Sequence, residues 1–215
     1  MRTILLRLSP VKPQPGMIKA AACVLRNGGL VAFPTETVYG LGANLLNKGA
    51  VGKIYRIKKR PKNKPLTVHI ADIKAVKKMV GKIPSGAKRL AERFWPGPLT
   101  LVLKDKRGRK TGFRMPDNRI AFLLIKKADV PIVAPSANIS GNRPPKSAKE
   151  VLRDLDGKID MVLDGGKTRV GIESTVVDMS GKNFKVLREG AISEAEIWRA
   201  ISPHPALSPK GRGLR

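Results

Sequence analysis

The sequence predicts an α/β fold with a twisted mixed sheet flanked by helices. Short apolar segments alternate along the chain with longer amphipathic ones, and glycine or proline turns join many of them. Most of the short segments are hydrophobic throughout, which is typical of strands with both faces covered. A length of 215 residues suits one domain with a sizeable core.

Helices are predicted from amphipathic periodicity and from residues that favour helix ends. The segment “PGMIKAAACVLRNGG” ends at a pair of glycines, and Asn47 is suited to cap a helix that Pro61 ends. Asp72 is suited to cap the helix that follows it, and another helix is predicted at 85–94.

Two capping boxes predict where the last two helices begin. Ser147 precedes Glu150 by three residues, and Ser193 precedes Glu196 by the same spacing. In such a box the serine side chain accepts a hydrogen bond from the glutamate amide, and the glutamate accepts one from the serine amide.

Strands are predicted where short apolar or β-branched runs lie between turn residues. The segment “TGFRMPDN” adds a candidate strand that reaches Arg114 just before a proline. In chain order, the other predicted strands are 30–33, 66–70, 99–104, 120–125, 131–135, 161–164, 174–179 and 184–188.

Three regions are expected: an N-terminal arm (1–15), a main domain (16–201) and a tail (202–215). The tail holds three prolines and no periodic pattern, so we expect it to be disordered. Arg7 interrupts the apolar start, and no apolar run approaches the ~18–20 residues of a spanning helix, so no signal peptide and no membrane contact are expected. A lone cysteine, Cys23, excludes an internal disulfide framework, and a cytoplasmic location is expected.

The charge of the chain predicts an anionic partner. Lys and Arg number 43 and Asp and Glu 16, which gives a formal net charge of +27. Such a field attracts nucleic acids and nucleotides, although a generally basic protein is the alternative. Because aromatic residues make up 4%, we expect phosphate contacts by Lys and Arg rather than stacking on bases.

Common nucleotide and hydrolase signatures are absent. The segment “GGKTRVG” resembles the end of a P-loop, but Met161 stands where that motif requires its first glycine. No G-x-G-x-x-G, H-E-x-x-H or G-x-S-x-G occurs. The only histidines are His69 and His204, so a histidine-rich metal site is excluded and no metal-binding residue is predicted.

Lys58 lies within the apolar stripe of the helix that Asn47 begins. It follows Ile54 by four residues, so it either extends outward to solvent or points into a cleft at the end of the helix. Arg60 and Lys62 follow directly, and the chain then continues to Thr67 and His69. These cations at one corner of the sheet are suited to a polyphosphate.

Three further segments place polar groups at strand ends. Ser136 and Asn138 follow one strand, Arg114 ends another, and Ser174 and Arg188 lie at the ends of the last two. An open α/β sheet binds its ligand at such ends, although an ordinary polar turn explains each segment equally well alone. Together they offer hydroxyls, amides and cations but few carboxylates, which favours anion binding over paired-carboxylate chemistry.

The segments “GGLVAFPTETVYGLGAN”, “IYRIKKRPKNKPLTVHI”, “FWPGPLTLVL”, “VAPSANISG” and “GIESTVVD…VLREGAIS” resemble the YrdC/TsaC family. The resemblance extends over about residues 16–200 and includes the family signature Lys-x-Arg…Ser-x-Asn. It implies a YrdC-like fold around a basic concave cavity. It also implies a nucleotidyltransferase that makes threonylcarbamoyl-adenylate and pyrophosphate from L-threonine, bicarbonate and ATP. A downstream tRNA threonylcarbamoyl transferase would then modify the adenosine next to the anticodon.

The same resemblance implies roles for individual residues. Those expected to bind threonine are Thr35, Thr67, His69, Arg114 and Ser174. Those expected to bind ATP are Lys58, Arg60, Lys62, Ser136, Asn138 and Arg188, with Lys58 and Arg60 as the catalytic pair. Mg2+ is expected to arrive with ATP, without a dedicated carboxylate cage in the protein.

Three interpretations stay open from the sequence. The chain lacks the linker and second domain of longer relatives, so we expect the short, single-domain form of the synthase. A related carbamoyltransferase joins the same domain to zinc-finger segments, and one cysteine excludes that arrangement here. A non-catalytic protein that binds double-stranded RNA or tRNA, or that acts in ribosome maturation, is the alternative function. Glu36 either steers the amine of threonine or pairs with a nearby cation.

Overall fold

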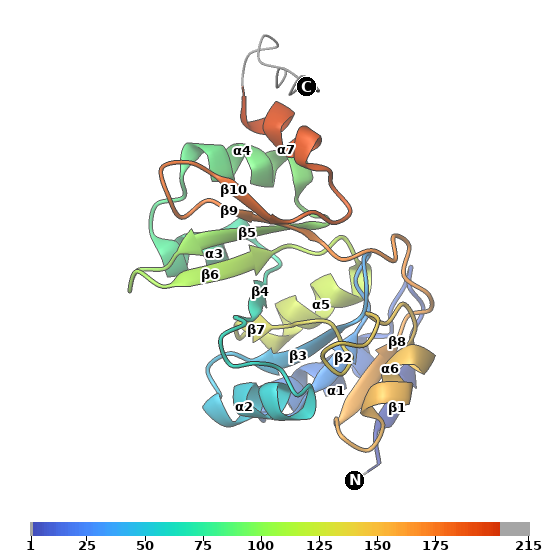
Figure 1. Cartoon of the computed structure of the whole chain (residues 1–215). Helices are drawn as coiled ribbons and strands as arrows, with labels where there is room; N and C mark the ends of the chain where they lie inside the picture. The colour runs from blue at the N-terminus through green and yellow to red at the C-terminus, as the bar shows by residue number, and fades with distance from the viewer. Residues whose placement is uncertain (1, 203–215) are drawn as a thin grey trace.

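A ten-stranded mixed sheet extends through the molecule (Figure 1). The computed structural model describes residues 2–202. The strands lie in the order β1-β8-β2-β3-β7-β4-β6-β5-β9-β10. They are β1 (Ile4–Arg7), β2 (Val31–Phe33), β3 (Gly40–Asn44), β4 (Thr67–His69), β5 (Leu99–Lys104), β6 (Lys110–Arg114), β7 (Ile132–Val133), β8 (Met161–Asp164), β9 (Thr175–Asp178) and β10 (Lys185–Arg188).

Helices cover both faces of the sheet. They are α1 (Pro15–Arg26), α2 (Lys48–Ile57), α3 (Ile73–Val80), α4 (Ser85–Phe94), α5 (Arg119–Ala128), α6 (Ala148–Leu155) and α7 (Glu194–Ile201). Helices α1 and α5 pack against each other, α2 contacts β3, α6 contacts β8, and α4 packs against β5 and α7. Among residues 2–202, no helix is both long and apolar enough to cross a membrane.

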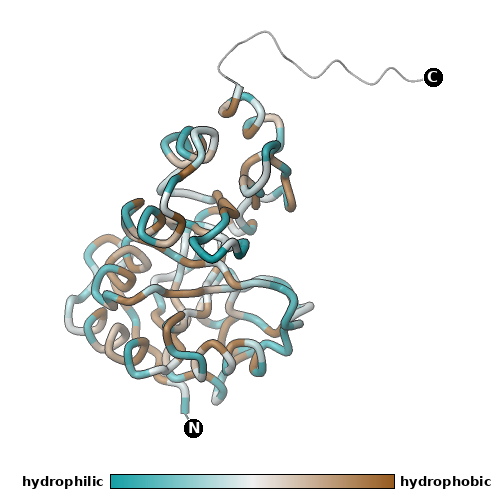
Figure 2. Tube along the Cα trace, turned by 90° about the vertical axis from the view of Figure 1, so that its left-hand side faces the viewer, coloured by the Kyte–Doolittle hydropathy of each residue, from teal (hydrophilic) through white to brown (hydrophobic). Residues whose placement is uncertain are grey.

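The interior divides into two hydrophobic clusters, one on each side of β2. Val31 and Phe33 belong to the cluster that includes α1 and α5, whereas Ala32 belongs to the larger cluster that includes α2, α4 and α6. Successive side chains of a strand point to opposite faces, so a strand with two covered faces has to be apolar throughout. In Figure 2, hydrophobic and hydrophilic residues alternate along the helices, as is typical of amphipathic helices.

Most of the predicted strands are confirmed, and the segment “TGFR” forms β6 as expected. The strand predicted at 120–125 is wrong, because these residues lie in α5. Asn118 caps this helix by accepting hydrogen bonds from the amides of Ile120 and Ala121. A continuous apolar run does not by itself distinguish a buried helix from a strand, and the cap determines the outcome here.

Two strands were not predicted. The N-terminal segment contributes β1, which pairs in parallel with β8. The glycine-containing segment “GLGAN” forms β3, and a Cβ at Gly42 would lie 2.8 Å from the ring of Phe33 on the neighbouring strand. Gly42 therefore lets this ring pack over the sheet. The predicted tail lies outside the described residues except for Ser202.

The helix caps agree in part with the prediction. Asn47 and Ser193 cap as expected, and the box at Ser193 is complete. Ser147 caps α6 as predicted, because its hydroxyl accepts from the amide of Glu150 at 3.3 Å. The predicted box is incomplete, because the Glu150 carboxylate accepts from the amide of Lys146 rather than from that of Ser147. Helix α2 also ends before the expected proline, since its last helical residue is followed closely by Lys59 at a φ of 50°.

A buried hydroxyl joins the start of β9 to the segment that follows β10. Thr175 Oγ1 donates to the Ile192 carbonyl at 2.5 Å and accepts from the amides of Gly190 and Ile192 at 2.9 and 3.0 Å. A Cβ at Gly190 would overlap the backbone of the residues just before Thr175. This close approach fixes the backbone next to Ser174 and Arg188.

Replacing Thr175 by valine is expected to destabilise the fold by about 2–3 kcal/mol, because three buried backbone groups lose one shared partner. Urea denaturation measures the change. Thr168→Val is the matched control: its buried Oγ1 has no hydrogen-bond partner among residues 2–202, so the free energy of unfolding should stay the same or rise. Equal losses in the two variants would contradict this explanation.

Candidate functional site

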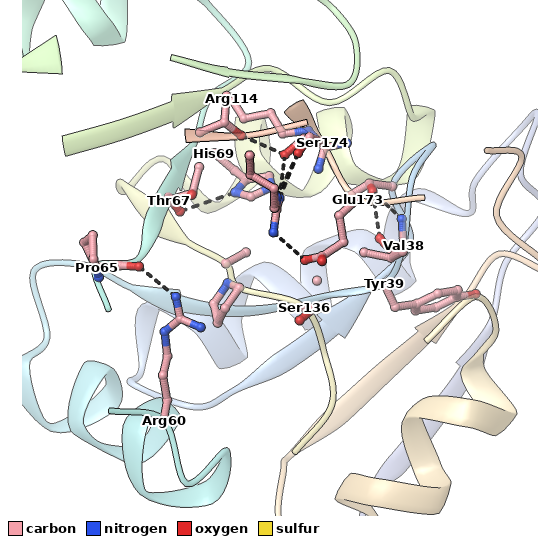
Figure 3. Close-up of a pocket in the computed structure, with 16 residues that line it drawn as sticks. Val38, Tyr39, Arg60, Pro65, Thr67, His69, Arg114, Ser136, Glu173 and Ser174 are labelled. Carbon is pink, nitrogen blue, oxygen red and sulfur yellow. Dashed lines mark hydrogen bonds and ion pairs between the residues drawn. The ribbon is translucent and has the colours of Figure 1, made fainter. Parts of the chain in front are cut away.

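A small cavity of about 100 Å³ lies where the two halves of the sheet meet (Figure 3). Its wall comes from the β2–β3 loop, the ends of β4 and β6, the turn after β7 and the start of β9. Most of the predicted site residues line it, namely Thr35, Arg60, Thr67, His69, Arg114, Ser136, Ser174 and Arg188. Lys58 and Asn138 are buried directly behind Ser136, whereas Lys62 is exposed outside the cavity wall.

Backbone hydrogen bonds hold the β2–β3 loop against the turn after β7. The amide of Leu41 donates to the Pro135 carbonyl at 2.8 Å, and the amide of Ala137 donates to the Tyr39 carbonyl at 2.8 Å. The opening motif and the Ser-Ala-Asn turn (residues 136–142) are therefore neighbours in space. The sequence separates them by about a hundred residues, and only the sheet order brings them together.

The Thr35 hydroxyl shapes the loop on which it lies. Oγ1 donates to the Val38 carbonyl at 2.7 Å and accepts from the amides of Thr37 and Val38 at 3.2 and 3.3 Å. A threonine that bonds to its own loop in this way forms a compact turn. The Tyr39 hydroxyl adds a second anchor by donating to the Gly166 carbonyl at 2.7 Å.

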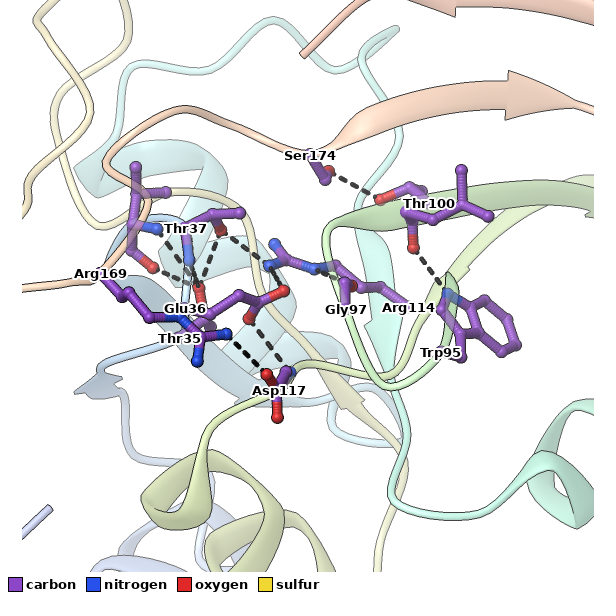
Figure 4. Close-up of polar contacts among 12 residues, drawn as sticks. Thr35, Glu36, Thr37, Trp95, Gly97, Thr100, Arg114, Asp117, Arg169 and Ser174 are labelled. Atoms are coloured by element: carbon purple, nitrogen blue, oxygen red, sulfur yellow. Dashed lines mark hydrogen bonds and ion pairs between the residues drawn. The ribbon is translucent and has the colours of Figure 1, made fainter. Parts of the chain in front are cut away.

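A buried ion pair crosses between the two halves of the sheet (Figure 4). Arg114 Nη2 donates to Glu36 Oε1 at 2.8 Å and to Thr37 Oγ1 at 2.7 Å. Glu36 Oε2 accepts from the amide of Asp117 at 3.1 Å, and the side chains of Arg114 and Glu36 are 6% and 2% exposed. Of the two readings of Glu36, the structure supports pairing with a cation.

His69 is a neutral side chain in the cavity wall. Burial, and then the positive charge of Arg114, lower the pKa of His69 to about 3. Nδ1 lies 3.4 Å from the carbonyl of Thr67, which is an acceptor, so this nitrogen carries the hydrogen. Nε2 is then left with its lone pair and is suited to accept a hydrogen bond from a ligand.

Lys58 is buried behind the Ser-Ala-Asn turn rather than extended to solvent. Nζ donates to the carbonyls of Ser136 and Asn138 at 2.5 Å each and to Asn138 Oδ1 at 3.2 Å. Burial, and then the nearby charge of Arg60, lower the pKa of Lys58 to about 8. Three simultaneous acceptors require all three hydrogens, so this geometry belongs to the charged ammonium.

Arg188 and Glu173 form an ion pair at the mouth of the cavity. Arg188 Nη1 donates to Glu173 Oε1 at 2.8 Å, and Nη2 donates to the Ser174 carbonyl at 2.8 Å. Both side chains are more than a third exposed. The pair is therefore open to solvent and to exchange with an incoming anion.

Sequence reasoning missed Thr100 as a cavity residue. Its Oγ1 lies 2.9 Å from Ser174 Oγ, and the parallel pairing of β5 with β9 places the two hydroxyls together. Thr100 follows directly after the first residue of a predicted strand, but its partner strand was not deducible from the sequence. Glu173 directly precedes Ser174 in the sequence, and its pairing with Arg188 also depends on the fold.

The chemistry of the lining favours an anionic ligand. Three arginines reach the cavity, Arg60, Arg114 and Arg188, together with several hydroxyls and one carboxylate, Glu173. Within residues 2–202, no cluster of three or more His, Cys, Asp or Glu side chains is placed to hold a metal ion. The arrangement is suited to carboxylate and phosphate recognition through guanidinium groups.

Comparisons with known proteins agree with this interpretation. The family model Sua5_yciO_yrdC, described as telomere recombination, matches residues 23–190. The threonylcarbamoyl-AMP synthase of Pyrococcus abyssi is 47% identical over 205 residues, which cover 90% of this chain and 60% of the relative. That of Bacillus subtilis is 47% identical over 206 residues, covering 91% of this chain and 59% of the relative. P. abyssi Sua5 complexed with L-threonine superposes with a TM-score of 0.89 at 44% identity, covering 93% of this chain and 61% of that one. The chain thus spans about 60% of the length of these relatives.

Glu36→Gln is expected to lower the free energy of unfolding by about 3 kcal/mol, because Arg114 is left as a buried charge without a counterion. Urea denaturation at neutral pH measures the loss. The control is Asp117→Asn, which removes the partner of Arg169 in an ion pair whose side chains are 72% and 51% exposed. That variant should lose less than about 1 kcal/mol, and an equal loss in both would refute the argument.

Proposed function

Since the chain belongs to the Sua5–YciO–YrdC family, we propose that it forms threonylcarbamoyl-AMP and pyrophosphate from L-threonine, bicarbonate and ATP. This makes it a nucleotidyltransferase. The observation that supports the proposal most directly is the cavity in which Arg60, Arg114 and Arg188 converge with Ser136 and Ser174. The names of relatives with 47% identity agree with it.

L-Threonine is proposed to bind at the Arg114 side of the cavity. Arg114 Nη2 donates to Glu36 and Thr37. Among the described residues, Arg114 Nη1 has no hydrogen-bond partner. That nitrogen is free to bind the α-carboxylate. The Nε2 lone pair of His69 would accept from the threonine hydroxyl, with Thr67 and Ser174 as further hydroxyl contacts.

ATP is proposed to bind on the other side, between Arg60, Arg188 and the Ser-Ala-Asn turn. Arg60 already donates to the carbonyls of Lys64 and Pro65 at 3.1 and 2.9 Å, which orients its guanidinium in the wall. Lys58 would contribute by exchanging one carbonyl partner for a phosphate oxygen. Lys62 would reach the triphosphate from the surface.

The reaction needs positioning and charge more than acid–base catalysis. The amine of threonine combines with bicarbonate to give an N-carboxylate and water, and a closed site protects this labile group. A carbamate oxygen then attacks the α-phosphorus while the bond to pyrophosphate breaks. Lys58, Arg60 and Arg188 would stabilise the charge on the leaving group.

Mg2+ would enter with ATP and offset charge on the phosphates. Magnesium in phosphate sites typically takes one or two carboxylates, with phosphate oxygens and water completing the shell. Glu173 is the carboxylate in the cavity wall that could bind it. The product would pass to a tRNA threonylcarbamoyl transferase, and a cytoplasmic location would suit that step.

Lys58→Ala is expected to lower turnover by about 10²-fold or more, because the buried ammonium no longer holds the turn or reaches the phosphates. The assay follows threonine-dependent pyrophosphate and the adenylate under conditions that preserve the labile product. Lys59→Gln, a change at the exposed neighbour, should keep full activity. Failure of the unaltered protein to make the adenylate would disprove the proposed function.

ATP affinity is expected to weaken as the pH rises above about 8, the pKa of Lys58. The protonated form that holds the turn predominates below this pH, and above it the population falls tenfold for each pH unit. Calorimetric titration with ATP from pH 6.5 to 9.5 measures the dissociation constant. Cys23→Ser, a change at an exposed side chain of α1 away from the cavity, is the control, and its profile should match the parent. An affinity constant across the whole range would contradict the role of the Lys58 charge.

A further inference from the structure

A buried carboxylate holds the Ser-Ala-Asn turn from the side opposite to Lys58. Asp154 of α6 is 6% exposed. Its Oδ2 accepts from the amide of Ile139 at 3.0 Å and from Asn142 Nδ2 at 2.8 Å. Both donors belong to the turn, so one oxygen atom fixes it at two points.

Hydrogen bonds continue from this anchor to the ammonium of Lys58. Asn138 Nδ2 donates to the Asn142 carbonyl at 2.7 Å, and Asn138 Oδ1 accepts from Lys58 Nζ at 3.2 Å. The amide of Asn138 is therefore oriented from both ends. Hydrogen bonds through Asn142 and Asn138 thus connect the carboxylate to the ammonium, which do not contact each other.

The place of Asp154 on its helix argues against a role in helix stability. It lies in the last turn of α6, where the negative end of the helix dipole disfavours an acidic side chain. Burial opposes its ionisation, but hydrogen bonds from Asn142 and Ile139 and the nearby Arg153 lower the pKa of the carboxyl overall. The two hydrogen bonds that Asp154 accepts from the turn explain why a charged acceptor occupies this unfavourable position on the helix.

We propose that Asp154 is a positioning residue for the nucleotide subsite, which it maintains by fixing the Ser-Ala-Asn turn. The inference rests on the proposed function for the identity of the ligand. Asp154 acts through Ser136, Asn138 and Lys58 and does not itself line the cavity. The threonine side depends on Arg114 and Glu36, which Asp154 does not contact.

Loss of the anchor should reduce ATP affinity without changing threonine affinity. When the turn is released, only part of the population presents the binding geometry, and the apparent dissociation constant rises by the inverse of that fraction. Two lost hydrogen bonds to a charged acceptor are enough for a change of about tenfold or more. The dissociation constant for L-threonine should change less than about twofold.

The test compares Asp154→Ala and Asp154→Asn with Asp156→Asn, a change at an exposed aspartate just beyond the same helix. Titration calorimetry measures ATP and L-threonine separately, and thermal melts confirm that each variant is folded. We expect about tenfold weaker ATP binding for alanine and a partial recovery for asparagine, whose amide oxygen accepts the same two bonds. The Asp156 variant should match the parent. Equal weakening for both substrates, or none for either, would overturn the proposal.

A double-mutant cycle with Asn142→Ala separates positioning from a general loss of structure. Asn142 and Asp154 act through the same bond, so their effects on ATP affinity should be less than additive. Full additivity would count against the proposal.

Hydrogen exchange at the Ile139 amide gives a readout that does not depend on the substrates. Exchange should speed up in Asp154→Ala and stay slow in Asp154→Asn. If the parent protein makes no adenylate, the proposed function fails, while this exchange still reports whether Asp154 fixes the turn. Unchanged exchange in Asp154→Ala would refute the positioning role even in an active enzyme.

Discussion

The buried ion pair between Arg114 and Glu36 is the interaction on which the site depends. Within residues 2–202, the sheet is continuous between its two halves only through β3, β7 and β4, and β7 is two residues long. Such a short ladder supplies few hydrogen bonds. The larger hydrophobic cluster also joins the two halves, and the Arg114–Glu36 pair adds a polar contact between them. Removing two charges from water is costly, and only the further bonds from Thr37 and the Asp117 amide make the pair favourable. Arg114 also lines the cavity, so the guanidinium that joins the two halves is part of the cavity wall as well.

The Ser-Ala-Asn turn is held by buried charged side chains rather than by strand pairing. A turn at the end of a two-residue strand has little ladder to hold it, and it lies instead between a buried cation and a buried anion. Lys58 binds its carbonyl groups, and Asp154 binds its amide and the Asn142 side chain. Carbonyls need donors and amides need acceptors, so opposite charges on opposite sides satisfy both kinds of backbone group. Buried charges on both sides therefore fix the geometry of the turn.

The sequence was sufficient to predict the residue types that line the cavity. It was insufficient to predict which of these residues pair with one another. Ser136, Arg114 and Ser174 were predictable because polar groups at the ends of apolar strands are typical of ligand sites in α/β sheets. The role expected of Thr35 came from the family resemblance alone. Lys58 was predictable as unusual because it interrupts an apolar stripe. Helix α5 was not predictable, because an unbroken apolar run suits either a helix or a strand. Strand β3 was not predictable either, because its glycines are uncommon in strands. The pairing of Glu36 and the support from Asp154 join residues that are far apart in the chain, and only the topology brings such partners together.

The division of β2 between two hydrophobic clusters constrains the number of residues in this segment more tightly than it constrains their identity. Val31 and Phe33 face one cluster and Ala32 the other, and the strand leads within two residues to Thr35. A single inserted or deleted residue here would reverse which side chain enters which cluster, because the period of a strand is two. The same slip would turn the Thr35 loop toward the wrong face of the sheet. Evolution of this segment is thus open to exchanges among apolar side chains and closed to insertions and deletions, whereas the exposed turns at 106–109 and 181–183 can vary in length.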